Sequence, residues 1–330
     1  MGAIPIRRRV FVVGAAASTL CARTAVQAQA RADTYRIICG FPPGGPVDLI
    51  CRKLAERMAA ITGANAFVEN KVGAAGRLAV AELVKAPADG SAMLVTAASI
   101  ITMYPHLYKQ LTYDIFTDLT PVGTVASTAF AFAAGPAVPD SATTVTEVVR
   151  WSQAKGAAIA CGNSGAGSMQ HFLASMISRE TGIEINHVPY RGGAASMQAL
   201  AGGEVPLAVG TESAARALAQ AGKLRVLATT GAQRSALYSQ APTFAELGWP
   251  ALSQREWFGV LMPARVPMPT VEKTAALLAA IVGSPEVRET WDKQSLSVDN
   301  MHPAALKAAI QREYDFWAPI IRSSGFTPEA

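Results

Sequence analysis

The sequence predicts an α/β protein with two lobes, each built around an open and mostly parallel sheet. From residue 35 onward, short apolar runs alternate with segments of helical periodicity, a rhythm typical of parallel strands covered by helices. Half of the 330 residues are apolar, and a chain of this length and composition can form more than one hydrophobic core. We therefore expect two sheets joined by a hinge of two strands.

The first α/β unit extends to residue 125. Its helix repeats Ile50, Leu54 and Met58 at helical spacing, and turns rich in proline and glycine separate its elements. In order, we expect a strand at 35–41, a turn at 42–46, a helix at 47–61, a strand at 66–69, a helix at 78–85, a turn at 87–90 and a strand at 92–97.

The second unit continues this alternation. In order, we expect a helix at 145–153, a strand at 157–161, a loop at 162–167, a helix at 169–181, a strand at 185–188, a helix at 194–201, a strand at 207–210, a helix at 213–219 and a strand at 224–229. Beyond Pro242 the chain is more aromatic and too short for a separate domain. We therefore assign residues 31–127 and 230–330 to the first lobe and 128–229 to the second, with crossings near 122–135 and 224–231.

The first 30 residues predict an export signal. A basic run at Arg7–Arg9 precedes an apolar stretch at 10–20, and the small residues Ala28 and Ala30 suit a cleavage site after Ala30. We therefore predict a periplasmic protein. Arg8 and Arg9 also fit a twin-arginine signal, so the sequence leaves Sec and twin-arginine export open.

The composition argues against several function classes. The signal contains four of the 29 basic residues and no acid, which leaves 25 basic against 24 acidic residues and no basic stripe of the kind that binds nucleic acid. Cys39, Cys51 and Cys161 form no C-x-x-C pair and have no histidine at zinc spacing. We expect no metal and no cofactor, while one disulfide and buried free thiols both remain open.

Two strand-to-helix loops are the candidate binding elements, because ligands of open α/β sheets lie beyond the carboxyl ends of the strands. The first is Phe-Pro-Pro-Gly-Gly-Pro-Val-Asp at 41–48, and the second is Cys-Gly-Asn-Ser-Gly-Ala-Gly-Ser at 161–168, followed by His171. Convergent N–H groups in such loops can hold a carboxylate without an arginine. Asp48 suits both a ligand contact and a helix-end residue, and the sequence does not separate these roles.

An ordered set of motifs resembles the solute receptors of the tripartite tricarboxylate transporter family, the Bug proteins. The motifs are Phe-Pro-Pro-Gly-Gly with Asp48, Val-Glu-Asn-Lys at 68–71, Gly-Ala-Ala-Gly at 73–76, Ala-Asp-Gly at 88–90, His-Val-Pro-Tyr-Arg-Gly at 187–192, Ala-Gly-Lys-Leu-Arg at 221–225 and Trp-Phe-Gly at 257–259. The resemblance implies a two-lobed, type II-like periplasmic binding protein. It also implies that a monomer captures a small organic carboxylate and passes it to one large and one small membrane subunit.

The resemblance also nominates ligand-binding residues. In the first lobe these are Phe41, Gly44, Gly45, Asp48 and, after the third strand, Ser99; in the second they are Ser164, Gly165, Gly167, Ser168, His171, Tyr190, Arg191 and Gly192. His171 equally suits a buried histidine bonded to backbone, and Tyr190 equally suits packing.

The sequence departs from the family at two places. The segment at 97–105 is more apolar than in relatives, and the acid that relatives carry after the Gly202-Gly203 turn is missing, because Gly210-Thr211-Glu212 stands there. A cleft without that acid disfavours a ligand ammonium group. We therefore expect a plain or partly apolar carboxylate rather than a free amino acid.

Two other functions compete with transport. Ser164 follows a strand as the nucleophile of a serine hydrolase does, but Ala166 breaks the G-x-S-x-G spacing. We therefore predict no enzyme and no catalytic residue. A ligand sensor that acts on a signalling partner is the second alternative, and the sequence does not exclude it.

Overall fold

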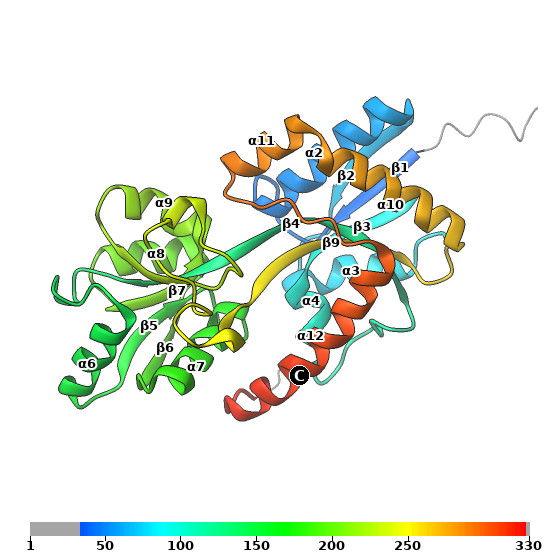
Figure 1. The fold of residues 1–330 in the computed structure, drawn as a ribbon. Coiled ribbons are helices and arrows are strands. Elements are labelled where there is room, and N and C mark those ends of the chain that lie inside the picture. Colours follow the sequence, from blue (N-terminus) through cyan, green and yellow to red (C-terminus); the bar gives the residue numbers. More distant parts are fainter. Residues whose placement is uncertain (1–33, 328–330) are drawn as a thin grey trace, which may run out of the picture.

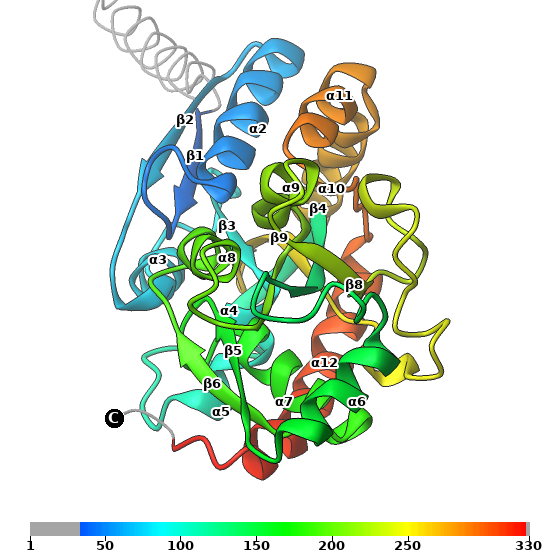
Figure 2. The ribbon, with the colours of Figure 1, turned by 90° about the vertical axis from the view of Figure 1, so that its left-hand side faces the viewer.

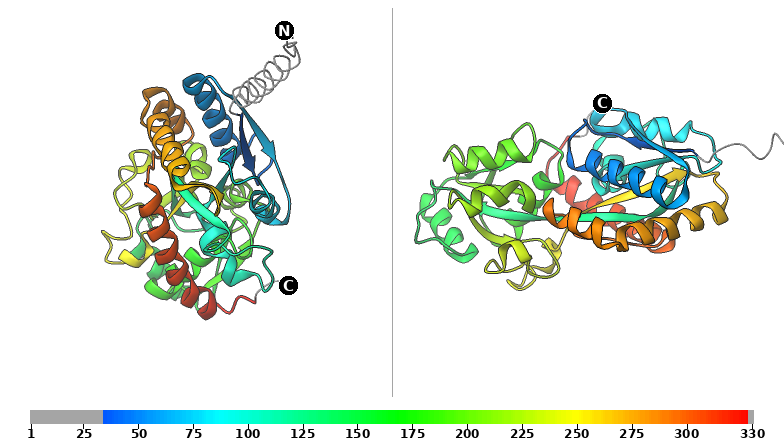
Figure 3. Two further views of the ribbon diagram at one scale, coloured as in Figure 1. Left: turned by 90° about the vertical axis from the view of Figure 1, so that its right-hand side faces the viewer. Right: turned by 90° about the horizontal axis from the view of Figure 1, so that it is seen from above.

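The structure consists of two lobes that lie side by side (Figures 1 and 3). It is a computed structural model that describes residues 34–327, so the predicted export signal lies outside the described residues. Strand β4 (Leu119–Ala134) and strand β9 (Arg255–Pro263) run between the lobes. The predicted α/β class is confirmed, but the lobes share one mixed sheet of nine strands, in which β4 pairs with strands of both lobes.

The first lobe contains the sheet order β2-β1-β3-β9-β4. Strand β1 is parallel to β2 and β3, whereas β9 is antiparallel to both β3 and β4. The elements are β1 (Thr34–Cys39), α2 (Pro46–Thr62), β2 (Asn65–Asn70), η1 (Ala74–Gly76), α3 (Arg77–Val84), β3 (Ala92–Ala97), α4 (Ala98–Thr102) and α5 (Tyr104–Leu107).

The second lobe continues the sheet as β4-β7-β5-β6, and β8 also pairs with β4. Strands β6, β5 and β7 are parallel, and β7 and β8 are antiparallel to β4. The elements are α6 (Val145–Lys155), β5 (Ile159–Asn163), α7 (Met169–Thr181), β6 (Ile185–Pro189), α8 (Gly193–Ala201), β7 (Leu207–Thr211), α9 (Glu212–Gln220) and β8 (Arg225–Thr229).

The second crossing differs from the expected position at 224–231. That segment contains β8, which pairs with β4 inside the second sheet, and the chain enters the first sheet only at β9. Before β9, Phe244 and Leu252 pack in the core of the second lobe. The reason is that β4 is long enough to pair with β7 and β8 at one end and with β9 at the other.

The C-terminal segment packs on both lobes. Its elements after β9 are α10 (Met268–Gly283), α11 (Pro285–Lys293) and α12 (Pro303–Ser323), and two short turns, η2 (Ala236–Tyr238) and η3 (Pro250–Leu252), precede β9. In α12, Leu306 belongs to a core cluster of the first lobe, whereas Trp317 and Ile320 belong to the core of the second. Helix α12 therefore crosses between the lobes and ends beside α7 (Figures 1 and 2).

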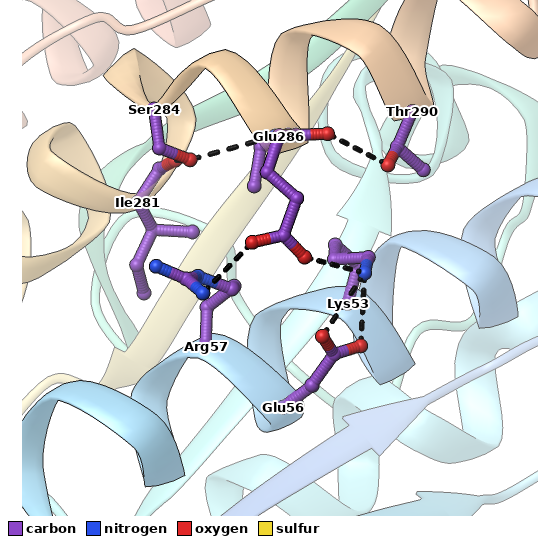
Figure 4. Close-up of polar contacts among 8 residues, drawn as sticks. Lys53, Glu56, Arg57, Ile281, Ser284, Glu286 and Thr290 are labelled. Atoms are coloured by element: carbon purple, nitrogen blue, oxygen red, sulfur yellow. Dashed lines mark hydrogen bonds and ion pairs between the residues drawn. The ribbon is translucent and has the colours of Figure 1, made fainter.

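An ion-pair network fastens α11 to α2 (Figure 4). Glu286 accepts from Lys53 Nζ at 3.2 Å and from Arg57 Nη1 at 2.8 Å, and Lys53 also contacts Glu56. The Ser284 hydroxyl caps α11 by accepting from the N–H of Val287. These contacts join helices that are far apart in the sequence and hold the C-terminal segment on the first lobe.

Cys39, Cys51 and Cys161 are free and buried, so of the two alternatives the structure shows buried thiols. Burial raises the pKa of Cys161 to about 12. Within residues 34–327 no helix combines the length and apolarity needed to cross a bilayer, and no cluster of metal-ligating side chains occurs there.

Candidate functional site

A cavity of about 360 Å³ lies between the lobes, next to both predicted loops. It is lined from the first lobe mainly by the turn after β1, helices α4 and α5 and strand β9, and from the second lobe by the loop between β5 and α7. Of the residues predicted from the sequence, Phe41, Ser99, Ser164, Gly165, Gly167 and Ser168 line it. The parallel sheets therefore bring the carboxyl ends of β1 and β5 to one shared space.

The loop after β5 presents an unbroken run of residues to this cavity, from Ser164 to Gln170. The side chain of Asn163 accepts the N–H of Gly165 at 3.0 Å, and the Ser168 hydroxyl caps α7 by accepting the N–H of His171 at 3.2 Å. Because Ser168 and the first residues of α7 line the cavity, the positive end of the helix dipole faces it. This arrangement favours an anion at that position.

His171 supports this loop from behind and is not among the lining residues. Its Nδ1 accepts the N–H of Gly167 at 3.1 Å, and its ring lies against the ring of His187, with 4.3 Å between centroids. Burial and the neighbouring His187 lower the pKa of His171 to about 4. The imidazole is therefore neutral near pH 7, which leaves Nδ1 free to accept this bond.

The turn after β1 is held by Asp48, whose residue is only 2% exposed. Its carboxylate accepts the N–H of Gly44 at 2.9 Å, Asn70 Nδ2 at 2.8 Å and Arg52 Nε at 2.8 Å. Burial acts to raise the pKa of Asp48, but the bonds from Arg52, Gly44 and Asn70 together lower it. The N–H of Gly45 is directed to Pro42 O at 3.4 Å. Gly44, Gly45 and Asp48 thus bond within the turn, and none of the three lines the cavity.

The third predicted group, Tyr190 to Gly192, lies at the start of α8 and does not line the cavity. Tyr190 packs against the core cluster between α8 and β7, Arg191 is exposed, and Gly192 is the N-terminal cap of α8 with a φ of 100°. Tyr190 nevertheless lies directly behind the loop after β5, because its N–H donates to Asn163 O at 3.0 Å.

Several lining residues were missed by the sequence analysis, namely Tyr104, Tyr108, Glu256, Phe258 and Phe326. Glu256 is the most informative, because it is the only charged side chain among the described residues that line the cavity. Its Oε1 accepts the N–H of Ser99 at 2.8 Å, and burial raises its pKa. The signal was available in β9, where residues two apart such as Glu256 and Phe258 share one face of the strand.

Glu256 corrects one expectation. The sequence predicts a cleft without an acid, because none follows the Gly202-Gly203 turn at the expected position. The structure instead supplies an acid from the other lobe. The cavity therefore does not disfavour a ligand ammonium group in the way the sequence suggests.

The chain matches the family model described as the tripartite tricarboxylate transporter family receptor over residues 50–326. It belongs to this receptor family. Protein BugT of Bordetella pertussis is 27% identical over 311 residues, which cover 92% of this chain and 94% of BugT. A UPF0065 protein in the gbd 5' region of Cupriavidus necator is 30% identical over 298 residues, covering 87% of this chain and 89% of that protein.

Solved structures agree with this assignment. Rpa4515 of R. palustris, solved with adipate, superposes with a TM-score of 0.77 at 27% identity, covering 90% of this receptor and 98% of that chain. The periplasmic binding protein BugD superposes with a TM-score of 0.73, also at 27% identity, covering 90% and 99%. The fold and the family are thus those of periplasmic solute-binding receptors.

His171, the first histidine after Ser164 in the sequence, is bonded to the backbone of the loop. Within the described residues, no hydrogen bond joins the Ser164 hydroxyl to a histidine, and Nδ1 of His171 accepts from Gly167 instead. A nucleophilic serine requires a base within hydrogen-bond reach.

Proposed function

We propose that this receptor captures a small organic carboxylate in the periplasm and delivers it, as a monomer, to a tripartite tricarboxylate-type transporter with one large and one small membrane subunit. The observation that carries the proposal is the run from Ser164 to Gln170, which lines the cavity with backbone and hydroxyl groups at the start of α7. The adipate found in Rpa4515 supports a carboxylate as the ligand class.

The energetics suit a receptor that must release its ligand. A hydrogen bond to a charged group contributes about 1.5–3 kcal/mol. Three or four such bonds from the loop would give an affinity of the order of micromolar, which corresponds to about 8 kcal/mol. Phe41, Phe258 and Tyr104 supply the apolar and aromatic wall that excludes water around the rest of the ligand.

We propose that the lobes close on the ligand by bending at the strands that run between them. Strands β4 and β9 run between the lobes, and α12 and Leu107 of α5 pack in the core of the second lobe. Because both lobes line the cavity, a bound ligand stabilises the closed form by contacting both. We propose that the membrane subunits recognise this closed form.

Binding and hydrolysis are separated by Ser164→Ala. Native mass spectrometry of protein purified without denaturation identifies a retained ligand, and calorimetry with a panel of carboxylates measures affinity. We expect saturable binding with one ligand per chain, weakened about tenfold by the substitution because one hydroxyl contact is lost. Consumption of a carboxylic ester by the wild type, abolished in Ser164→Ala, would contradict the proposal. Ser91→Ala, at a half-buried serine in the turn before β3 that does not line the cavity, is the control.

A further inference from the structure

The charge of the cavity restricts the ligand further than its class. No lysine, arginine or histidine side chain is among the described residues that line it, and Glu256 is the only acid. The loop of the second lobe and a carboxyl group of the first lobe therefore line the same cavity. A ligand with a negative charge at both ends would place one of them beside Glu256.

The surroundings of Glu256 do not compensate its charge. The titratable groups that face it are Glu313 of α12 and Tyr104 of α5, each of whose pKa is raised in part by Glu256. Arg255, its neighbour in β9, ion-pairs with Asp299 at 2.8 Å, and successive strand residues point to opposite faces. Ser99 bonds the carboxylate through its N–H at 2.8 Å and through its side chain.

We propose that Glu256 makes this receptor selective for zwitterions, that is, carboxylic acids that carry a protonated amine. The ammonium group pairs with Glu256 in the first lobe, and the ligand carboxylate binds the loop at 164–168 in the second. This inference rests on the proposed function, since it assumes a carboxylate at that loop. It also gives closure a simple cause, because each end of the ligand binds a different lobe.

The position of Glu256 matters as much as its charge. Residue Ala97, the last of β3, pairs with Phe258 of β9, so Glu256 lies just beyond the end of β3 and meets the N–H of Ser99. That bond fixes one carboxylate oxygen and the direction of the group. A fixed carboxylate in a partly dry cavity binds an ammonium group more strongly than one in water does.

The test compares matched pairs of ligands on the wild-type receptor by calorimetry at pH 7. The pairs are glutarate with 4-aminobutyrate and succinate with 3-aminopropanoate, in which an amine replaces one carboxylate. We expect the amino acid of each pair to bind at least tenfold more tightly. Burial raises the pKa of Glu256. On acidification, the receptor's affinity for the amino acids should therefore begin to weaken at a higher pH than if Glu256 had the pKa of an ordinary glutamate.

The variant Glu256→Gln then isolates the charge, because its amide oxygen can still accept from Ser99. We expect the affinity for amino acids to fall at least tenfold and that for dicarboxylates to rise. Glu289→Gln, which removes the same charge at an exposed pair with Lys293 on α11, should change neither. Tighter binding of the dicarboxylates by the wild type, or equal weakening of both classes in Glu256→Gln, would overturn the inference and leave the proposed function intact. Failure of the wild type to bind either class would overturn both.

Discussion

The two strand-to-helix turns look alike in sequence but differ in what they offer to a ligand. Both follow a parallel strand, both are rich in glycine and both begin a helix. In the first turn, Asp48 accepts the N–H of Gly44 and the Asn70 amide, so its polar groups are used within the fold. In the second, no acid occupies the first turn of α7, and the loop from Ser164 to Ser168 faces the cavity. Because Gly165 and Gly167 of the second loop also donate within the fold, the difference between the turns lies in the acid beside the first and in the contact of the second with the cavity.

Among the substitutions that test this difference between the two turns, we expect Asp48→Ala to have the largest effect, and we expect it on stability. The change removes the acceptor for Gly44, Asn70 and Arg52, and because Asp48 is buried we expect a loss of about 2 kcal/mol in the free energy of unfolding. Denaturant titration measures it. The ligand affinity of the folded variant should change less than threefold. Asp140→Ala, which breaks the exposed pair with Arg225, should cost under about 0.5 kcal/mol.

The pH dependence of stability also tests the structural role of Asp48, because the direction of the change is fixed by its lowered pKa. The pKa of Asp48 is lower in the folded protein than in the unfolded chain, so the unfolded chain binds the proton first as the pH falls. Its contribution is present above the ordinary pKa of an aspartate and is lost as the pH drops through the folded value. Asp48→Ala should therefore flatten the acid limb of the stability curve. A large loss of ligand affinity with unchanged stability would instead make the two turns equivalent.

A smaller effect, this time on affinity, is expected from Gly167→Ala. Gly167 has a φ of 75°, and an added Cβ would lie 3.2 Å from the ring of Phe326. The backbone strain of about 1–2 kcal/mol would shift the loop, and we expect about a tenfold loss of carboxylate affinity by calorimetry. Gly182→Ala is the matched control, because its φ is 76° and its added Cβ would meet no atom within 4 Å. Equal affinity losses in both variants would show that the loop at 167 has no special part in binding.

Local pattern predicted most of the fold and about half of the site, and the reasons for the failures are physical. Strands β1, β3 and β5 follow from short apolar runs between helices. Strand β9 and its crossing did not, because antiparallel pairing with β4 joins residues more than 100 positions apart in the chain and leaves no local signal. Glu256 was missed for the same reason, since its place beside Ser99 depends on the pairing of β3 with β9.

The glycine-rich motifs show the complementary limit. They correctly directed attention to both loops, but composition alone does not say which N–H groups are already bonded. The N–H of Gly44 is directed to Asp48, and in the second loop those of Gly165 and Gly167 are directed to Asn163 and His171, although that loop lines the cavity. Satisfaction of backbone donors is a property of the folded chain, so the contribution of each turn could be decided only from the structure.

The smallest effect in this comparison is expected from His171→Leu. The substitution removes the Nδ1 acceptor of the Gly167 N–H but keeps an apolar side chain against Phe172, so we expect about a threefold loss of carboxylate affinity at pH 7. His187→Leu is the control, because it removes the neighbouring ring while leaving the bond to Gly167 in place.

Since the pKa of His171 is about 4, below that of a histidine in the unfolded chain, stability should fall as the pH decreases from about 6.5 towards 4. Calorimetry and thermal unfolding between pH 4 and 8 measure both effects, and His171→Leu should lessen the pH dependence of each. A loss greater for His187→Leu than for His171→Leu would mean that packing of the two rings, and not the bond to Gly167, positions the loop.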